Sequence, residues 1–499
     1  MEHRITTLLN WCTTINIEID ERLQIFPDAA GLTAYSGATP IEPLQTLVKI
    51  PKTAVLSVKS CSASQFIESS PYGLEAQLAL SLALLVELER GTSSRWYGYL
   101  QSLPDTVVSL PVFWGLEFEE GTLEDIKDGK DALKWLKGTE VEKLLVGSDG
   151  TPLIDSLRKY FHEIVTPTMA RLSSESLPSF HHFCRAYSLA SSRAFLVDAY
   201  HGLSMVPIAD AFNHTDDYHV HLETEYEVCS ECGSLQQCLH DRDIEPTLGH
   251  PTSGFQQIEK DNTYDMVSNA AITPHSEVFN TYGETLSNAQ LLTRYGFILD
   301  VNENDNVSWE LESLIHFLEE SKPSKSRGSC TPLELPWNTL VESFDVDVFS
   351  NSELIFEPAE AAYCINCEGK VSWQFWLVVV FHQCASLVPA EEILSISMEL
   401  GMYQTSREIQ NLRASVTIGA TTRHNYLLPS LAQKTACMIR DLCQQRKTYL
   451  GDGRDQENLG NLVDELDSSQ SRTKLALLQV MTEISILNSL NYGGQSSTL

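Results

Sequence analysis

The sequence is short of positive charge, with 34 lysine and arginine residues against 67 aspartate and glutamate residues in a chain of 499. The resulting formal net charge of −33 disfavours contact with nucleic acid or an anionic membrane surface and favours basic partners. The sequence also lacks an apolar run of eighteen or more residues, so no membrane-spanning helix is expected. These absences predict that the partner is a basic protein, with no direct contact to nucleic acid and none to a membrane. The alternative is that the acidic balance of the whole chain serves solubility alone.

We expect no secretory signal, because the first residues show no basic stretch followed by an apolar core. No arginine- and serine-rich segment of the kind found in transit peptides is present. The twelve cysteines are scattered along the chain instead of forming a dense framework. We therefore expect the cytoplasm, the nucleus or both as the location, where cysteines serve as thiols or metal ligands rather than in disulfides.

The residues that are present follow an alternating pattern of strand-like and helical segments. Short strand-like runs broken by glycine and proline occur in the first 90 residues, and helical periodicity then prevails to about residue 195. Strand-like runs return up to about residue 300, and helical periodicity continues to the end. The pattern predicts helices over 74–89, 152–172 and 371–387 and strands over 197–207 and 263–273.

Three blocks in the middle of the chain carry the most specific pattern. Residues 207–214 read Pro-Ile-Ala-Asp-Ala-Phe-Asn-His, residues 277–283 read Glu-Val-Phe-Asn-Thr-Tyr-Gly, and residues 288–297 end in Tyr-Gly-Phe. Together with supporting blocks from about residue 28 to residue 299, they resemble the catalytic half of SET-domain protein lysine methyltransferases. The branch that they resemble includes Rubisco large-subunit methyltransferase and the fungal ribosomal lysine methyltransferases.

The resemblance implies an α+β fold, in which a β-rich SET domain is split by a helical insertion and followed by a mainly α-helical substrate-binding domain. The expected SET domain spans 1–300, with a first part at 1–90, the insertion at 91–195 and a second part at 196–300. The expected helical domain spans 301–499. The resemblance also implies an enzyme that transfers a methyl group from S-adenosyl-L-methionine to a lysine of a basic protein, with a ribosomal protein as the expected substrate. The alternative is a catalytically silent SET scaffold that binds a basic protein partner.

Methyl transfer to lysine needs a narrow aromatic channel. The amine must arrive neutral and in line with the breaking bond, although a free lysine has a pKa near 10.4. Aromatic walls exclude water and favour the neutral amine, and their ring faces tolerate the cationic product. By resemblance, Tyr282 lies beside the transferring methyl group and Tyr295 shapes the lysine pocket. The alternative is that both are ordinary half-buried tyrosines with satisfied hydroxyls.

The resemblance assigns the cofactor to residues from several segments. Arg193 carries a rigid fork of donors suited to the methionine carboxylate. Asn213 and His214 are expected beneath the cofactor, and Tyr282 is expected to touch it.

The resemblance assigns three further residues to the cofactor. One of them has an alternative role, and the other two lie where the sequence departs from the usual family pattern. Asp210 either contacts the cofactor or caps the turn that follows it. Gly31 and Leu32 are expected to present backbone groups to the cofactor, because glycine permits close approach. The family usually has a Gly-x-Gly-Leu turn at this point, and the present sequence keeps one of the two glycines.

A cysteine-rich segment at 229–240 has the spacing of a metal site. Cys229, Cys232, Cys238 and His240 form a C-x2-C-x5-C-x-H pattern, and three thiolates with one imidazole make a closed four-coordinate zinc set. Such a site is structural because no ligand position is left for water. The alternatives are a loop with incidental reduced thiols and, as a separate function, a zinc-dependent adaptor or redox sensor centred on this segment.

Overall fold

The computed structural model of the chain forms two compact units. Unit 1 comprises Met1–Phe113, Val146–Glu284 and Arg294–Gly296, and unit 2 comprises Trp114–Leu145, Thr285–Thr293 and Phe297–Leu499. Part of the segment expected as a helical insertion therefore groups with the carboxyl-terminal residues. The structure describes residues 2–28, 31–118, 122–172, 177–224, 227–235, 238, 240, 262–320, 341–358, 361–384, 390–412 and 427–490.

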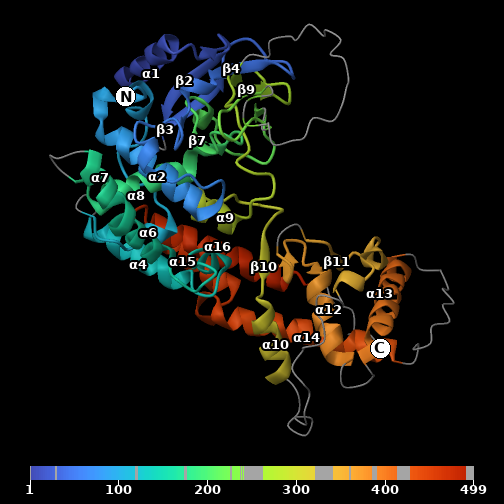
Figure 1. Ribbon diagram of the computed structural model, residues 1–499. Helices are drawn as coiled ribbons and strands as arrows, with labels where there is room; N and C mark the ends of the chain where they lie inside the picture. The colour runs from blue at the N-terminus through green and yellow to red at the C-terminus, as the bar shows by residue number, and fades with distance from the viewer. Residues whose placement is uncertain are drawn as a thin grey trace, which may run out of the picture. The chain divides into compact units, whose positions relative to one another are not determined.

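Unit 1 contains a four-stranded antiparallel sheet with the order β1-β4-β9-β8. Its central strands β4 and β9 are labelled in Figure 1. The two central strands pair from Thr46 opposite Val267 to Pro51 opposite Thr263, so segments far apart in the sequence lie side by side. Tyr264 and Met266 point into the core and are fully buried. The strands are β1 (Glu18–Ile19), β4 (Thr46–Pro51), β9 (Thr263–Ser268) and β8 (Val220–Glu223).

Two smaller sheets complete the strands described in unit 1. The hairpin of β2 (Leu23–Asp28) and β3 (Gly31–Ser36) alternates buried and exposed positions along β2, as expected for a strand with one face on the core. The other sheet has the order β5-β7-β6. Its strands are β5 (Leu56–Ser57), β7 (Leu203–Met205) and β6 (Ala194–Leu196).

Two long helices of unit 1 pack against one another, α2 (Gly73–Glu89) and α8 (Phe180–Arg193). Most of α2 is buried because leucine and alanine occupy nearly all of its faces. Ser179 caps α8, its side chain accepting a hydrogen bond from the backbone N–H of His182. The last residue of α8 is Arg193, so this helix carries one of the predicted cofactor residues. The remaining α-helices described in unit 1 are α1 (Glu2–Thr14), α3 (Tyr97–Leu100), α6 (Leu153–Tyr160) and α7 (Thr166–Leu172).

Unit 2 is mainly helical, with a small sheet of order β10-β12-β13-β11. The backbone N–H groups of Arg472 and Thr473 at the start of α16 donate to the Asp128 carboxylate of α4 at 3.0 and 3.1 Å, which satisfies donors that a helix end leaves unpaired.

No helix that the structure describes is both long and apolar enough to cross a membrane. The helices of this unit are α4 (Leu123–Trp135), α5 (Glu140–Leu144), α10 (Leu311–Glu320), α12 (Trp373–Cys384), α13 (Ala390–Leu412), α14 (Leu428–Tyr449), α15 (Gln456–Glu465) and α16 (Ser471–Asn488), with α9 (Asn288–Tyr295) ending in unit 1. The strands are β10 (Asn306–Ser308), β11 (Ile355–Phe356), β12 (Cys364–Asn366) and β13 (Val371–Ser372).

A buried carboxyl group in unit 2 makes stability depend on pH. Glu483 is 1% exposed, and its Oε1 accepts hydrogen bonds from the backbone N–H of Glu140 at 2.8 Å and from Gln479 Nε2 at 3.0 Å. Burial and then the nearby charge of Glu140 raise the pKa of Glu483 to about 8. The fold therefore favours the protonated carboxyl group.

We expect Glu483→Gln to flatten the pH dependence of unfolding. Because the folded-state pKa is raised from its ordinary 4.5, the stabilisation by this group is complete below that pH and is lost as pH rises towards 8. The variant should gain stability relative to the original chain by roughly 3 kcal/mol between pH 5 and pH 8, measured by urea unfolding at both pH values. Glu457→Gln, at an exposed position, is the control. Parallel pH profiles for Glu483→Gln and the original chain would contradict this account.

Candidate functional site

Two segments far apart in the sequence run side by side at the centre of the candidate site. The Asn280 N–H donates to the Asn213 carbonyl at 2.8 Å, and the Thr215 N–H donates to the Asn280 carbonyl at 3.1 Å. His214 and Asn280 form a parallel bridge, and Asn280 is buried. The backbone thus brings the Asn-His block next to the Tyr-Gly block.

Three aromatic rings stack across these segments. The centroid of the His214 ring lies 5.2 Å from that of Tyr282 at an interplanar angle of 29°, and the Tyr282 centroid lies 4.6 Å from that of Tyr295 at 28°. The Tyr282 N–H donates to His214 Nδ1 at 3.0 Å, so the neutral imidazole carries its proton on Nε2. Burial lowers the pKa of His214 and raises the pKa of both Tyr282 and Tyr295. The stack is therefore uncharged near neutral pH.

Contacts of the two adjacent residues, Arg294 and Gly296, hold Tyr295 at the end of α9. Ser191 Oγ, near the end of α8, donates to the Arg294 carbonyl at 2.9 Å. Gly296 has a φ of +83°, and a Cβ at this position would lie 3.0 Å from the Ser109 carbonyl oxygen. The glycine after Tyr295 is therefore required both by the backbone conformation that ends the helix and by the close approach of another segment.

Arg193 and Asp210 form a buried charged pair. Arg193 Nη1 lies 3.6 Å from Asp210 Oδ2 and donates to the Asp210 backbone carbonyl at 3.3 Å. Tyr99 Oη donates to Asp210 Oδ2 at 2.8 Å. Burial raises the pKa of Asp210, against the opposing effect of Arg193, and burial followed by the Asp210 charge raises the pKa of Tyr99. Asp210 thus positions the Arg193 guanidinium.

The backbone before Asp210 adopts a strained conformation. Ile208 has φ +71° and ψ −37° and is fully buried, and a β-branched residue with positive φ is rare. Such a conformation costs about 1–3 kcal/mol and persists only where the surroundings enforce it. The turn Ala209–Ala211 follows directly, so the strained residue sets the direction in which Asp210 enters the site.

Asn213 contacts an acidic residue that lines a hollow on the surface. Asn213 Nδ2 donates to Glu277 Oε1 at 2.7 Å, and Thr33 Oγ1 donates to the same oxygen at 3.0 Å. Thr33 and Glu277 also line a hollow of about 490 Å³ beside the β2–β3 hairpin, together with Phe26, Pro27, Asp28 and Tyr35. Glu277, which lines the hollow, also contributes by its charge to the raised pKa of Tyr282, after the larger effect of burial.

Gly31 begins β3 and approaches Arg193 closely. A Cβ on Gly31 would lie 2.7 Å from Arg193 Nη2, and its φ of +136° disfavours other residues. Leu32 follows as a buried residue opposite Pro27 in the hairpin. One glycine is thus enough for the backbone to pass beside the guanidinium, and residues 29 and 30 lie outside the described part of the chain.

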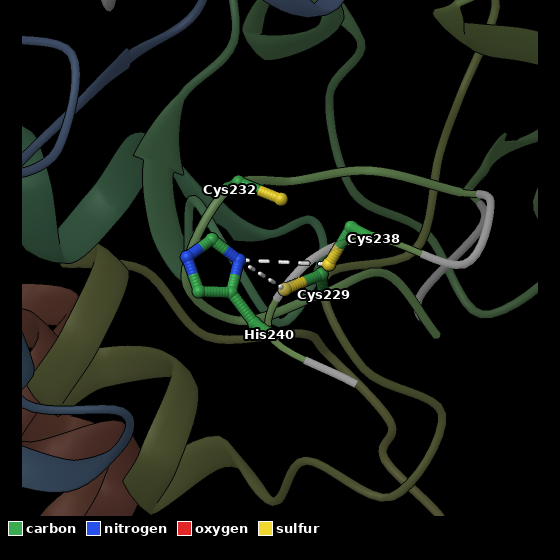
Figure 2. Close-up of side chains that lie close together, drawn as sticks. All are labelled: Cys229, Cys232, Cys238 and His240. Atoms are coloured by element: carbon green, nitrogen blue, oxygen red, sulfur yellow. Dashed lines mark hydrogen bonds between the residues drawn. The ribbon is translucent and has the colours of Figure 1, made fainter. Parts of the chain in front are cut away.

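The four residues of the cysteine-rich segment converge (Figure 2). Their ligand atoms all lie within 4.8 Å of one another. His240 Nδ1 is 3.7 Å from Cys229 Sγ and 3.5 Å from Cys238 Sγ. Backbone N–H groups of Glu231 and Cys232 donate to Cys229 Sγ and lower the pKa of this thiol to about 7. The sequence spacing thus corresponds to a compact cluster in unit 1.

Three residues that the sequence analysis left unassigned belong to the site. Tyr99, Thr33 and Glu277 each hydrogen-bond a residue predicted to bind the cofactor or its partner. Tyr99 stands in the block Trp96-Tyr97-Gly98-Tyr99-Leu100, and Glu277 is the first residue of a block used for the resemblance. Their membership of these blocks was the only signal in the sequence, because each partner lies in a distant segment.

Comparison with known proteins gives relatives that include named lysine methyltransferases. No protein-family model matches the chain. The chain is 26% identical over 344 residues to ribosomal lysine N-methyltransferase 3 of Saccharomyces cerevisiae, covering 58% of this chain and 60% of that protein. It is 26% identical over 319 residues to N-lysine methyltransferase SETD6 of Rattus norvegicus, covering 59% of this chain and 54% of that protein. The match thus spans less than two thirds of the length of these relatives.

Solved structures share the fold. The SET domain of LSMT bound to lysine and AdoHcy matches 98% of this chain and 90% of its own with a TM-score of 0.57 at 16% identity. Rubisco LSMT bound to AdoMet matches the same shares with a TM-score of 0.56 at 15% identity. The relatives are lysine methyltransferases and the fold is that of the LSMT structures, so the α+β SET fold with a helical carboxyl-terminal region is confirmed.

Proposed function

We propose that the chain is a protein-lysine N-methyltransferase that uses S-adenosyl-L-methionine. The observation that carries the proposal is the ring stack of His214, Tyr282 and Tyr295 beside the buried Arg193–Asp210 pair. An uncharged aromatic wall next to a fixed cation suits a site that aligns a neutral amine with a methyl donor. The names of the relatives and the ligands of the LSMT structures support the same activity.

Residues of the candidate site, one of which lines the hollow, fit the donor set that the cofactor needs. Its methionine end carries a carboxylate and an ammonium group, and Arg193 offers a fork of donors for the carboxylate. Glu277, held by Thr33 and Asn213, adds a carboxylate on the wall of the hollow for a cationic or hydroxyl group. Gly31 lacks the Cβ that would press on the guanidinium. When bound, the cofactor supplies an electrophilic methyl group on a sulfonium.

The aromatic stack prepares the lysine substrate. Tyr282 and Tyr295 exclude water from one side of the lysine stem, which favours the neutral amine, and the amine proton leaves to water before transfer. The same rings would hold the neutral amine nitrogen in line with the methyl group that the cofactor would supply. The Tyr282 hydroxyl orients the reacting groups and does not ionise, since burial raises its pKa.

We expect Gly31→Ala to weaken cofactor binding by roughly tenfold or more. The added Cβ would meet Arg193 Nη2 at 2.7 Å and displace the guanidinium from its place beside Asp210. Calorimetric titration with S-adenosylmethionine measures the change. Gly202→Ala is the matched control, because Gly202 also has positive φ, at +61°, but a Cβ there meets nothing within 4 Å. Equal affinities for the two variants would mean that the close approach of Gly31 does not matter for binding.

The substrate that we propose is a lysine of a ribosomal protein, docked by the helical residues 301–499. The net charge of −33 favours a basic partner, and the relative from Saccharomyces cerevisiae is named a ribosomal lysine methyltransferase. The corresponding location is the cytoplasm, the nucleus or both.

A labelling experiment tests this function. The purified chain and methyl-labelled S-adenosylmethionine are incubated with ribosomal proteins from cells that lack the gene, or with the ribosome-depleted basic proteins of the same cells. Label in one ribosomal protein supports the full proposal. Label confined to the ribosome-depleted fraction would support the methyl-transfer reaction but exclude a ribosomal protein as the substrate. Absence of both label and cofactor binding favours a silent SET scaffold instead.

A further inference from the structure

The connection between β8 and β9 contains Cys229, Cys232, Cys238 and His240. None of these four residues belongs to the ring stack or to the Arg193–Asp210 pair. The three cysteines approach His240 from one short stretch of chain, and Figure 2 shows the sulfurs of Cys229 and Cys238 facing one ring nitrogen. We propose that these four side chains bind one zinc ion in a closed structural site.

Two distances between ligand atoms match the edges of a zinc tetrahedron. With Zn–S near 2.3 Å and Zn–N near 2.0–2.1 Å, a regular tetrahedron has S···N edges of about 3.6 Å and S···S edges of about 3.8 Å. The observed Sγ···Nδ1 distances are 3.7 Å for Cys229 and 3.5 Å for Cys238. All four ligand atoms, including Cys232 Sγ, fall within 4.8 Å of one another. One ion fits between them with small side-chain adjustments.

The backbone of the segment is folded as a metal-binding turn. The Gly233 N–H donates to the Cys229 carbonyl at 2.8 Å, and the Cys229 N–H donates to the Ser234 carbonyl at 3.0 Å. Gly233 has a φ of +72°, which favours glycine and turns the chain back after Cys232. Cys229 and Cys232 are thereby presented on the same side of a tight turn, as two ligands of one ion must be.

This turn is attached to the body of unit 1 through an aromatic residue. A Cβ on Gly233 would lie 3.1 Å from Tyr200 Cδ1, so the turn packs directly on that ring. Tyr200 belongs to a turn fixed by Asp198, which accepts hydrogen bonds from the backbone N–H groups of Tyr200 and His201 and from Tyr264 Oη of β9. A metal ion in the cluster therefore fixes the start of the β8–β9 connection against the core.

The residues of this segment that the structure describes bury little apolar surface. Among the described residues between Glu227 and His240, Val228 is buried but Leu235 is 43% exposed. A short segment with so little apolar burial is ordered by metal binding rather than by a core of its own. The site is structural because three thiolates and one imidazole fill the coordination of zinc and leave no position for water or substrate.

Metal analysis of the purified full-length chain tests the proposal, which does not rest on the methyltransferase function. We expect about one zinc per chain and its loss in both Cys232→Ser and Cys238→Ser. His240→Cys should retain zinc, because a four-cysteine set also binds it, and this variant separates loss of a ligand from general misfolding. Cys437→Ser, at an exposed cysteine of unit 2, should leave the zinc content unchanged.

Limited proteolysis gives a local readout. Glutamyl endopeptidase should cleave after Glu231 faster when the zinc is chelated, and in Cys232→Ser without chelator, while cleavage in Cys437→Ser should match the original chain. Absence of zinc after equilibration with zinc salt, or zinc content in Cys232→Ser equal to that of the original chain, would overturn the proposal. So would a disulfide between any two of the three cysteines in the freshly purified protein.

Discussion

Replacing Tyr282 by phenylalanine should lower the turnover of lysine methylation by about 100-fold or more and leave cofactor affinity nearly unchanged. The substitution keeps the ring that stacks between His214 and Tyr295, with centroid distances of 5.2 and 4.6 Å. It removes one hydroxyl that lies near Arg193, Asp210 and Glu277 and remains protonated because burial raises its pKa. The loss should therefore appear in kcat rather than in binding.

The matched control is Tyr160→Phe, which removes a hydroxyl from another stacked tyrosine of the same unit. The Tyr160 ring lies 6.0 Å from that of Phe183, and this stack is retained in the variant. Steady-state methylation and calorimetric titration are measured for both variants. If Tyr282→Phe turns over at the rate of Tyr160→Phe, the hydroxyl has no part in the reaction.

Arg193→Ala should weaken binding of S-adenosylmethionine by about 100-fold and also destabilise unit 1. The guanidinium is the proposed partner of the cofactor carboxylate, and its removal deletes charge-assisted hydrogen bonds. It also leaves the Asp210 carboxylate, which is only 2% exposed, without the nearby positive charge. The neutral Tyr99 hydroxyl still donates to this carboxylate. Breaking a buried pair on one side costs about 3–5 kcal/mol.

The double variant Arg193→Ala with Asp210→Asn separates these two effects. Without the buried carboxylate, most of the lost stability should return, since an asparagine oxygen still accepts the Tyr99 hydrogen bond. Cofactor affinity should stay as low as in Arg193→Ala. Recovery of affinity together with stability would show that Arg193 supports the fold and does not hold the cofactor. Urea unfolding and calorimetric titration on the same samples distinguish the outcomes.

Local signals in the sequence predicted a helix or strand correctly where tertiary contacts favour the same structure. The helix predicted over 74–89 is α2 (Gly73–Glu89), because a leucine- and alanine-rich segment ends at a glycine. The helix predicted over 152–172 is interrupted by a π-helical turn at Phe161–Val165 between α6 and α7. The one predicted over 371–387 starts later, since residues 371–372 pair with β11 and β12. Pairing with distant strands is a tertiary effect that periodicity does not report.

The predicted strand over 197–207 is shortened for a similar reason. Strand β7 covers Leu203–Met205, because Asp198 forms a turn with the N–H groups of the residues that follow it. At the site, short motifs predicted roles for Tyr282, Tyr295, Arg193 and Asn213. The structure stacks the two tyrosine rings and joins Asn213 to Glu277, which lines the hollow. The hydrogen bonds of Tyr99 to Asp210 and of Asn213 to Glu277 join distant segments, and no local pattern indicates such pairs.

Chemical identification of the labelled product is the most direct test of the central claim. The original chain is incubated with methyl-labelled S-adenosylmethionine and a basic protein fraction, and the labelled protein is hydrolysed to amino acids. The account predicts that the label is recovered as N-methylated lysine and that Tyr282→Phe yields about one hundredth as much or less. Label on another amino acid, or no label from a chain that binds the cofactor and has been given every basic protein of the cell, would contradict it.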